Sequence, residues 1–115
     1  MGYERSKSVD SFYVHGFQYW DGPFALGRLS VGERVDLVPE PDNPYDTDAV
    51  AIYSQGEKLG FVPRAKNFLL ATLLAFGHED VFEAVVSGVR PDVEPWEQVR
   101  VTIRVRDNRN GKASR

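Results

Sequence analysis

Three aspartates and a tyrosine lie within seven residues of the segment EPDNPYDTDAVAIY, residues 40–53. Carboxylates can ligate a hard metal ion, transfer protons, or accept hydrogen bonds from a ligand. The tyrosine adds a flat ring on which another ring can stack. Turn formation alone is a further explanation, because Asn, Asp and Pro favour turns. Spacing and context must separate these possibilities.

The spacing of the aspartates argues against a calcium loop. Asp42, Asp46 and Asp48 are separated by four and two residues, whereas an EF-hand loop needs alternating ligands and a glycine at its sixth position. Pro44 occupies one of the alternate positions, and no glycine follows. We therefore predict no metal and no cofactor. A metal-dependent nuclease that uses these carboxylates is retained only as a third alternative.

The remaining polar residues give no sign of catalysis. His15 and His78 are the only histidines, and no serine or cysteine nucleophile motif accompanies them. His15 is expected in a strand, as a packed or surface residue. His78 is expected to interact with the end of a helix. The sequence therefore predicts a binding protein rather than an enzyme.

Composition limits the class of protein. The 115 residues include no cysteine and carry a formal net charge of −3, which disfavours a non-specific duplex-DNA binder. Residues 104–115 are nevertheless basic, with four Arg and one Lys against one Asp. No apolar run approaches the roughly 20 residues that span a bilayer, and no signal peptide is evident. We expect a cytoplasmic protein with no membrane partner.

Hydrophobic periodicity predicts a mostly β domain. Strands are expected over residues 11–16, 33–40, 49–54, 58–63, 81–90 and 99–106, with a hairpin turn at Gln55-Gly56-Glu57 and a bulge at Gly88. A short helical piece is expected near residues 24–29. A clearer helix around Leu69–Leu74 has Asn67 as its cap and Gly77 as its stop. This pattern suits a small antiparallel barrel or sandwich of about six strands with one or two helices.

Aromatic side chains with polar neighbours occur in two separate segments. Tyr19 and Trp20 follow the first predicted strand beside Gln18, while Tyr45 lies in the acidic loop and Phe61 in the hairpin. Such rings can belong to the core or cover the open end of a barrel. They can also form a platform on which nucleic-acid bases stack.

Two basic residues precede the predicted helix. Arg64 and Lys66 lie where the first turn is expected, and they could contact phosphates together with the N-terminus of the helix. The simpler interpretation is that both side chains are solvated.

Taken together, these motifs resemble those of the HIRAN domain. The string Asn43-Pro44-Tyr45-Asp46 followed by Ala49-Val50, and then the string KLGFVPR at residues 58–64, carry the resemblance. It extends over nearly the whole chain, and we take residues 11–106 as the domain, with flexible tails at 1–10 and 107–115. The resemblance implies an OB-like antiparallel β-barrel with helices. The family includes stand-alone bacterial proteins and modules of SNF2-type helicases in replication-fork repair.

The family resemblance also implies a function. HIRAN domains capture single-stranded DNA by its 3′ end, which makes such an end the expected partner, with a DNA-repair protein as a second one. Tyr45 would enclose the terminal base and Asp46 would accept a hydrogen bond from the 3′-hydroxyl. Tyr19, with Trp20 beside it, would supply an aromatic contact, and Arg64 would contact phosphate.

The sequence departs from the helicase-borne members at two positions. Gln18 replaces a basic residue before the loop tyrosine, and Phe61 replaces a polar residue in the hairpin strand. The alternative function is a protein-interaction or adaptor domain with the same fold and no DNA pocket. The net negative charge and Gln18 favour that alternative.

Overall fold

Six antiparallel strands form one sheet in the computed structural model, which describes residues 6–109. The strand order is β1-β6-β5-β2-β3-β4. The bounds are β1 (Ser6–Tyr13), β2 (Arg34–Pro39), β3 (Val50–Ser54), β4 (Glu57–Phe61), β5 (Phe82–Val89) and β6 (Val99–Arg106). The mostly β, antiparallel class predicted from the sequence is therefore confirmed.

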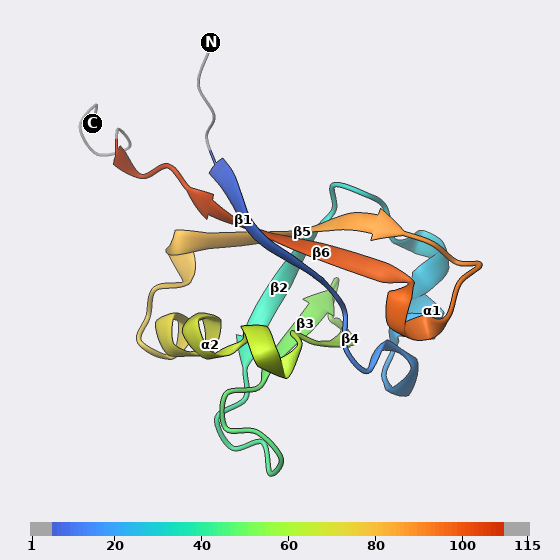
Figure 1. Ribbon diagram of the computed structural model, residues 1–115, viewed down its shortest axis with the longest axis horizontal. Helices are drawn as coiled ribbons and strands as arrows, with labels where there is room; N and C mark the ends of the chain where they lie inside the picture. Colours follow the sequence, from blue (N-terminus) through green and yellow to red (C-terminus); the bar gives the residue numbers. More distant parts are fainter. Residues whose placement is uncertain (1–5, 110–115) are drawn as a thin grey trace.

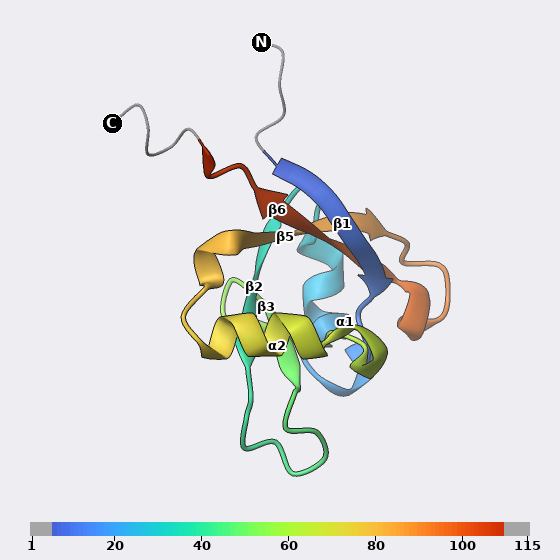
Figure 2. The same ribbon diagram turned by 60° about the vertical axis from the view of Figure 1, so that its left-hand side comes forward.

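Two helices accompany the sheet. They are α1 (Gly22–Ala25), which overlaps the start of the segment predicted near residues 24–29, and α2 (Phe68–Ala75), which contains the helix predicted around Leu69–Leu74. Short 3-10 turns occupy Phe17–Tyr19 (η1), Leu26–Arg28 (η2), Arg64–Lys66 (η3), Glu79–Val81 (η4) and Pro95–Glu97 (η5). Figure 2 shows α2 in front of the sheet, with the long β2–β3 loop hanging below it. No helix within residues 6–109 is long and apolar enough to cross a membrane.

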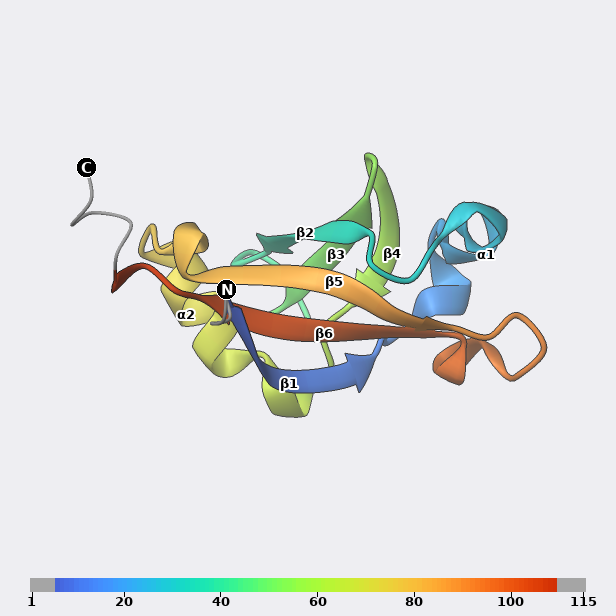
Figure 3. The same ribbon diagram turned by 90° about the horizontal axis from the view of Figure 1, so that it is seen from above.

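The predicted OB-like β-barrel is confirmed only in part, because the six-stranded sheet does not close. β1 and β4 are its two ends, and across residues 6–109 they meet only in an isolated bridge between His15 and Phe61. β2 and β5 pair over a short stretch around Val35 and Ala84, so the sheet bends there. Figure 1 shows β3 and β4 below β1, β5 and β6, with β2 running down toward them. In the view from above, β2, β3 and β4 lie on one side of β5 and β6, and β1 lies on the other (Figure 3). Periodicity predicts strands, but it does not determine how far two neighbouring strands pair.

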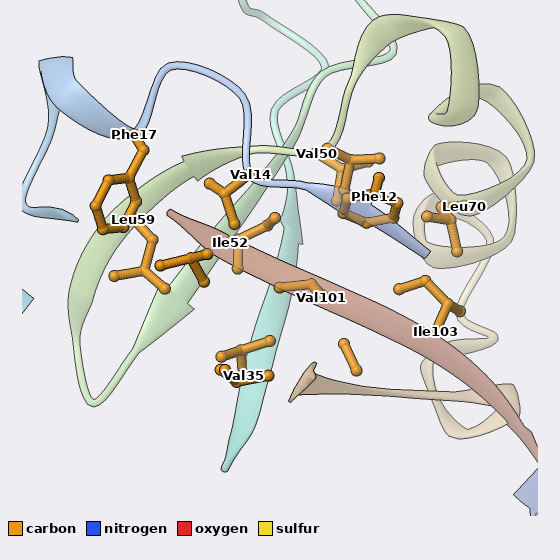
Figure 4. Packing of buried hydrophobic residues seen from close by; sticks show 14 of the residues in the cluster. Phe12, Val14, Phe17, Val35, Val50, Ile52, Leu59, Leu70, Val101 and Ile103 are labelled. Atoms are coloured by element: carbon orange, nitrogen blue, oxygen red, sulfur yellow. The ribbon is translucent and has the colours of Figure 1, made fainter. Parts of the chain in front are cut away.

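The hydrophobic core lies between these two parts of the bent sheet and under α2. It draws side chains from all six strands, because alternate residues of each strand point inward. Figure 4 shows Val14, Ile52, Val101 and Ile103 directed toward one another in this core. The predicted bulge in β5 is present, as a register shift between Val86 and Gly88.

The first strand begins earlier than expected. Residues 6–10 were assigned to a flexible tail, but the structure places them in β1, paired with the end of β6. Arg104 reinforces the pairing, since its Nε donates to Ser6 Oγ at 2.7 Å and its Nη1 to Ser8 Oγ at 2.9 Å. These polar residues carry no apolar alternation, so the pattern used for prediction could not detect them. The outermost parts of both predicted tails, 1–5 and 110–115, lie outside the described residues.

Gly60 allows β4 to approach the chain just beyond β1. A Cβ atom at this position would lie 2.4 Å from the carbonyl oxygen of His15, and φ is +149°. His15 and Phe61 exchange two backbone hydrogen bonds of 2.8 and 2.9 Å at the same place. Close backbone contact therefore requires glycine here.

Gly60→Ala should destabilise the fold by about 2 kcal/mol or more, because the new methyl group meets backbone atoms and the conformation disfavours a side chain. Urea unfolding measures the change. Gly27→Ala is the matched control, since a Cβ there meets no atom within 4 Å. Equal stability of the two variants would contradict the assignment.

Candidate functional site

The loop between β2 and β3 is organised by Asn43. Its Oδ1 accepts hydrogen bonds from the backbone amides of Tyr45, at 2.9 Å, and Asp46, at 3.2 Å. Its Nδ2 donates to Glu40 Oε1 at 3.1 Å. The turn expected at Asn43-Pro44 is thus present, with the Asn side chain replacing backbone hydrogen bonds. This turn leaves Tyr45 85% exposed.

Three donors from the protein surround the Asp46 carboxylate. Its Oδ1 accepts from the amide of Asp48 at 2.9 Å, and its Oδ2 accepts from Asn67 Nδ2 at 2.9 Å. The Nε of Arg64 lies 3.4 Å from the same Oδ2. The Asp48 amide first, and then Asn67 and Arg64, lower the pKa of Asp46 below its ordinary value, against a smaller opposing effect of burial. The carboxylate is therefore ionised at neutral pH.

Asn67 has a different role from the one predicted. It occupies the N-cap position of α2, but its side chain makes no capping hydrogen bond and its backbone is already helical. The amide group instead points to Asp46 and is buried. The residue thereby connects the first turn of α2 to the acidic loop.

Tyr45, Asp46, Phe61 and Arg64 line one hollow of about 460 Å³. The remaining lining residues are His15, Asn43, Ala49, Val62 and Asn67. The Arg64 guanidinium also donates to the backbone carbonyl of Tyr45. A second hollow of about 500 Å³ shares the acidic loop and extends to Phe68 on α2. The structure thus brings together four of the eight residues predicted for the site.

Lys58 joins the aromatic loop to the acidic loop. Its ammonium lies 3.8 Å from the Trp20 ring centroid and 4.4 Å from that of Phe61, which are cation–π contacts. The Trp20 and Phe61 rings meet edge to face with centroids 5.8 Å apart. The same ammonium donates to Glu40 Oε2 at 2.8 Å. Trp20 thereby supports Phe61, which forms one wall of the hollow.

Glu40 completes the connection. Its partial burial would raise the pKa of its carboxyl, but hydrogen bonds from Lys58 and Asn43 and the charge of Lys58 outweigh this, and the pKa is lowered. Glu40 therefore stays ionised and holds Lys58 and Asn43 at the same time.

The other predicted site residues lie elsewhere. Tyr19 is 77% exposed in η1 and lines neither hollow. Gln18 is part-buried, and its Oε1 has no hydrogen-bond partner. Lys66 pairs with Asp10 of β1 at 2.9 Å instead of facing the hollow. The sequence predicts Asp10 in a flexible tail, so it gives no indication of this ion pair.

Several lining or supporting residues are not among those predicted for the site, and His15, Asn67 and Lys58 are the most informative of them. His15 was treated as an isolated strand residue, Asn67 as a cap and Lys58 as part of a hairpin. The string KLGFVPR contains Lys58, so the motif itself carried a signal for that residue. Across the described part of the chain, no three His, Asp or Glu residues gather in a way that could hold a metal ion.

The model of the HIRAN domain matches residues 9–106. The chain belongs to the HIRAN domain family. No protein with a curated description matches it.

Two crystal structures are similar to this HIRAN domain. A protein from Lactobacillus plantarum is 27% identical, with a TM-score of 0.71, and the match covers 89% of this chain and 97% of that one. The HIRAN domain of human HLTF is 22% identical with a TM-score of 0.65, covering 94% of this chain and 85% of that one. The human domain shows that the fold is shared.

Lys58→Met should separate the two loops, because it removes the cation that Trp20, Phe61 and Glu40 share. We expect a loss of about 1–3 kcal/mol in the free energy of unfolding. In a Trp96→Phe background, Trp20 is the only tryptophan and its emission should shift to the red. Lys7→Met, at an exposed position of β1, is the control. Identical behaviour of the two variants would refute the role of Lys58.

The Asp46 carboxyl should titrate below its ordinary pKa of 3.8 in carbon-detected NMR. Because the folded pKa is lowered, the stabilisation is complete above the unfolded value and is lost as pH falls through the folded pKa. The stability difference between wild type and Asp46→Asn should therefore shrink in that acidic range. Titration at or above 3.8 would contradict the hydrogen-bond assignment.

Proposed function

We propose that this HIRAN domain binds single-stranded DNA and captures its free 3′-hydroxyl end in the hollow beside Tyr45. HIRAN domains are binding modules, and the family is known for nucleic-acid binding. The observation that carries the proposal is an ionised carboxylate, Asp46, held beside an exposed aromatic ring. We place this activity in the cytoplasm and in DNA repair, as the family resemblance implies.

Asp46 has room for one more donor. An ionised carboxylate offers about four acceptor sites, and the protein supplies three donors to it. The side chain is also 20% exposed, so a ligand can reach it. A free 3′-hydroxyl is a donor, and its hydrogen bond to a charged acceptor contributes about 1.5–3 kcal/mol.

The same charge disfavours the wrong ligands. A 3′-phosphate or a continuing strand would bring negative charge against the Asp46 carboxylate, with no proton to share. Such repulsion makes binding of a free 3′-hydroxyl end more favourable than binding of an internal position of a strand. Because Arg64 already contacts Asp46, the carboxylate stays in place when no ligand is bound.

Tyr45 provides the ring on which the terminal base stacks. Base stacking on an aromatic side chain contributes about 1–3 kcal/mol and tolerates any base. Phe61 also lines the hollow and is supported by Trp20. Recognition of the base should therefore depend on shape more than on sequence.

Arg64 is the phosphate contact of the proposal. Its side chain is 71% exposed next to the hollow. With few cations near the site, the salt dependence should be shallow, with a slope of roughly −0.7 for each phosphate contacted in a single strand. Chemical recognition of the end, rather than charge attraction, would then dominate the affinity.

Fluorescence anisotropy with short labelled oligonucleotides tests the end capture. Wild type should bind a 3′-hydroxyl end at least tenfold more tightly than a 3′-phosphate end. Asp46→Asn should reduce that preference, because the repulsion is removed and the amide can donate to a phosphate. Equal affinity of wild type for both ends, or no binding at low salt, would refute the proposal.

Tyr45→Ala should weaken binding to both kinds of end, by about 5- to 150-fold, through loss of stacking. Phe24→Ala is the matched control, since Phe24 is 84% exposed but lies on α1, outside the residues that line the hollow. If both variants bind like wild type, Tyr45 is not the platform. A protein partner recovered after nuclease treatment, combined with absence of DNA binding, would favour the adaptor alternative.

A further inference from the structure

The surface of α2 is apolar on both sides. Its sequence FLLATLLA contains no charged residue. Leu70 and Ala71 are buried against the core, which accounts for one side. On the other side, Phe68 is 66%, Leu69 62% and Phe76, which follows the last turn, 76% exposed.

These exposed side chains form one stripe. Phe68, Thr72 and Phe76 follow one another at four-residue intervals, which places them along one face of a helix, with Leu69 beside them. Thr72 lies at the centre, and its hydroxyl donates a hydrogen bond to the backbone carbonyl of Phe68 at 2.8 Å. Contiguous exposed apolar surface of this kind marks an interaction site. Figure 2 shows that α2 lies at the front of the molecule, where a partner can reach it.

Opposite charges flank the two ends of the stripe. Arg64 and Lys66 precede α2, with side chains 71% and 41% exposed, and they pair within the same chain with Asp46 and Asp10. Glu79 and Asp80 follow it and are exposed. The two ends of the stripe therefore carry complementary charges. If a second copy packs with its α2 antiparallel, its acidic end lies beside the basic end of the first copy. The dipoles of the two helices would also be antiparallel, which is favourable.

We propose that the protein forms a twofold-symmetric dimer in which α2 packs antiparallel against α2 of a second copy. Thr72 would lie on the symmetry axis. Phe68 and Phe76 are each four residues from Thr72, so Phe68 of one copy meets Phe76 of the other. Arg64 and Asp80 are each eight residues away, beyond the two ends of α2, so a base and an acid would lie near each end of the interface. Such an interface is isologous, as closed dimers require.

The dimer interface would extend to the candidate site. Phe68 lines the hollow that contains Asp46 and Thr47. Phe76 of the second copy, packed on Phe68, would therefore add an apolar wall at its rim. The dimer itself does not rest on the proposed function, since the stripe, its charges and its symmetry are independent of DNA.

Sedimentation velocity over a concentration series tests the dimer. The wild-type chain should shift from monomer to dimer as concentration rises, and Phe76→Glu should weaken association at least tenfold. Phe24→Glu, equally exposed on α1, should behave as wild type. Circular dichroism checks that each variant is folded, and Leu69→Glu replaces Phe76→Glu if it is not. A wild-type chain that stays monomeric up to about 1 mM would overturn the proposal.

Cysteine cross-linking tests the antiparallel geometry, because the natural chain has no cysteine. Under mild oxidation Thr72→Cys should form a disulfide dimer much faster than Ser87→Cys, an exposed position of β5. A mixture of Phe68→Cys and Phe76→Cys should yield the mixed disulfide in preference to either homodimer. Equal cross-linking of Thr72→Cys and Ser87→Cys, or a preference for the homodimers in the mixture, would contradict this arrangement.

Discussion

The Lys58 ammonium is the contact on which the candidate site depends. It touches the rings of Trp20 and Phe61 and donates to Glu40, which in turn accepts from Asn43. Asn43 then sets the backbone of the acidic loop through two amides. One partly buried cation thus connects two loops that no strand pairing holds together. A cation shared among a carboxylate and two ring faces is fixed in position, so both loops are placed before any ligand arrives.

Under the proposed function, the chemistry of the hollow would allow an acidic protein to recognise a nucleic acid. Non-specific binders depend on many cations that displace counterions from phosphates. Here a single carboxylate, kept ionised by Asp48, Asn67 and Arg64, would distinguish a hydroxyl from a phosphate. The feature of DNA that matters under the proposal is where the strand stops. Net charge is then a poor guide to function, because attraction to the whole polymer is not the source of selectivity.

The sequence predicted what depends on local patterns. Alternation found the six strands, and Asn43-Pro44 indicated the turn that presents Tyr45 and Asp46. Prediction from the sequence failed where contacts join segments that are far apart along the chain. Asn67 stands where the rule predicts a helix cap, yet its side chain donates to the Asp46 carboxylate, 21 residues away, and makes no capping hydrogen bond. The start of β1 was not predicted because its polar residues are held in place by pairing with β6. The open sheet was not predicted because closure depends on how many residues neighbouring strands pair.

A crystal structure of the protein with a short oligothymidylate ending in a free 3′-hydroxyl tests the central claim most directly. The account predicts the terminal base against the Tyr45 ring and the 3′-oxygen within hydrogen-bond distance of the Asp46 carboxylate. An oligonucleotide bound elsewhere on the surface, or one whose 3′ end points away from Asp46, would contradict it.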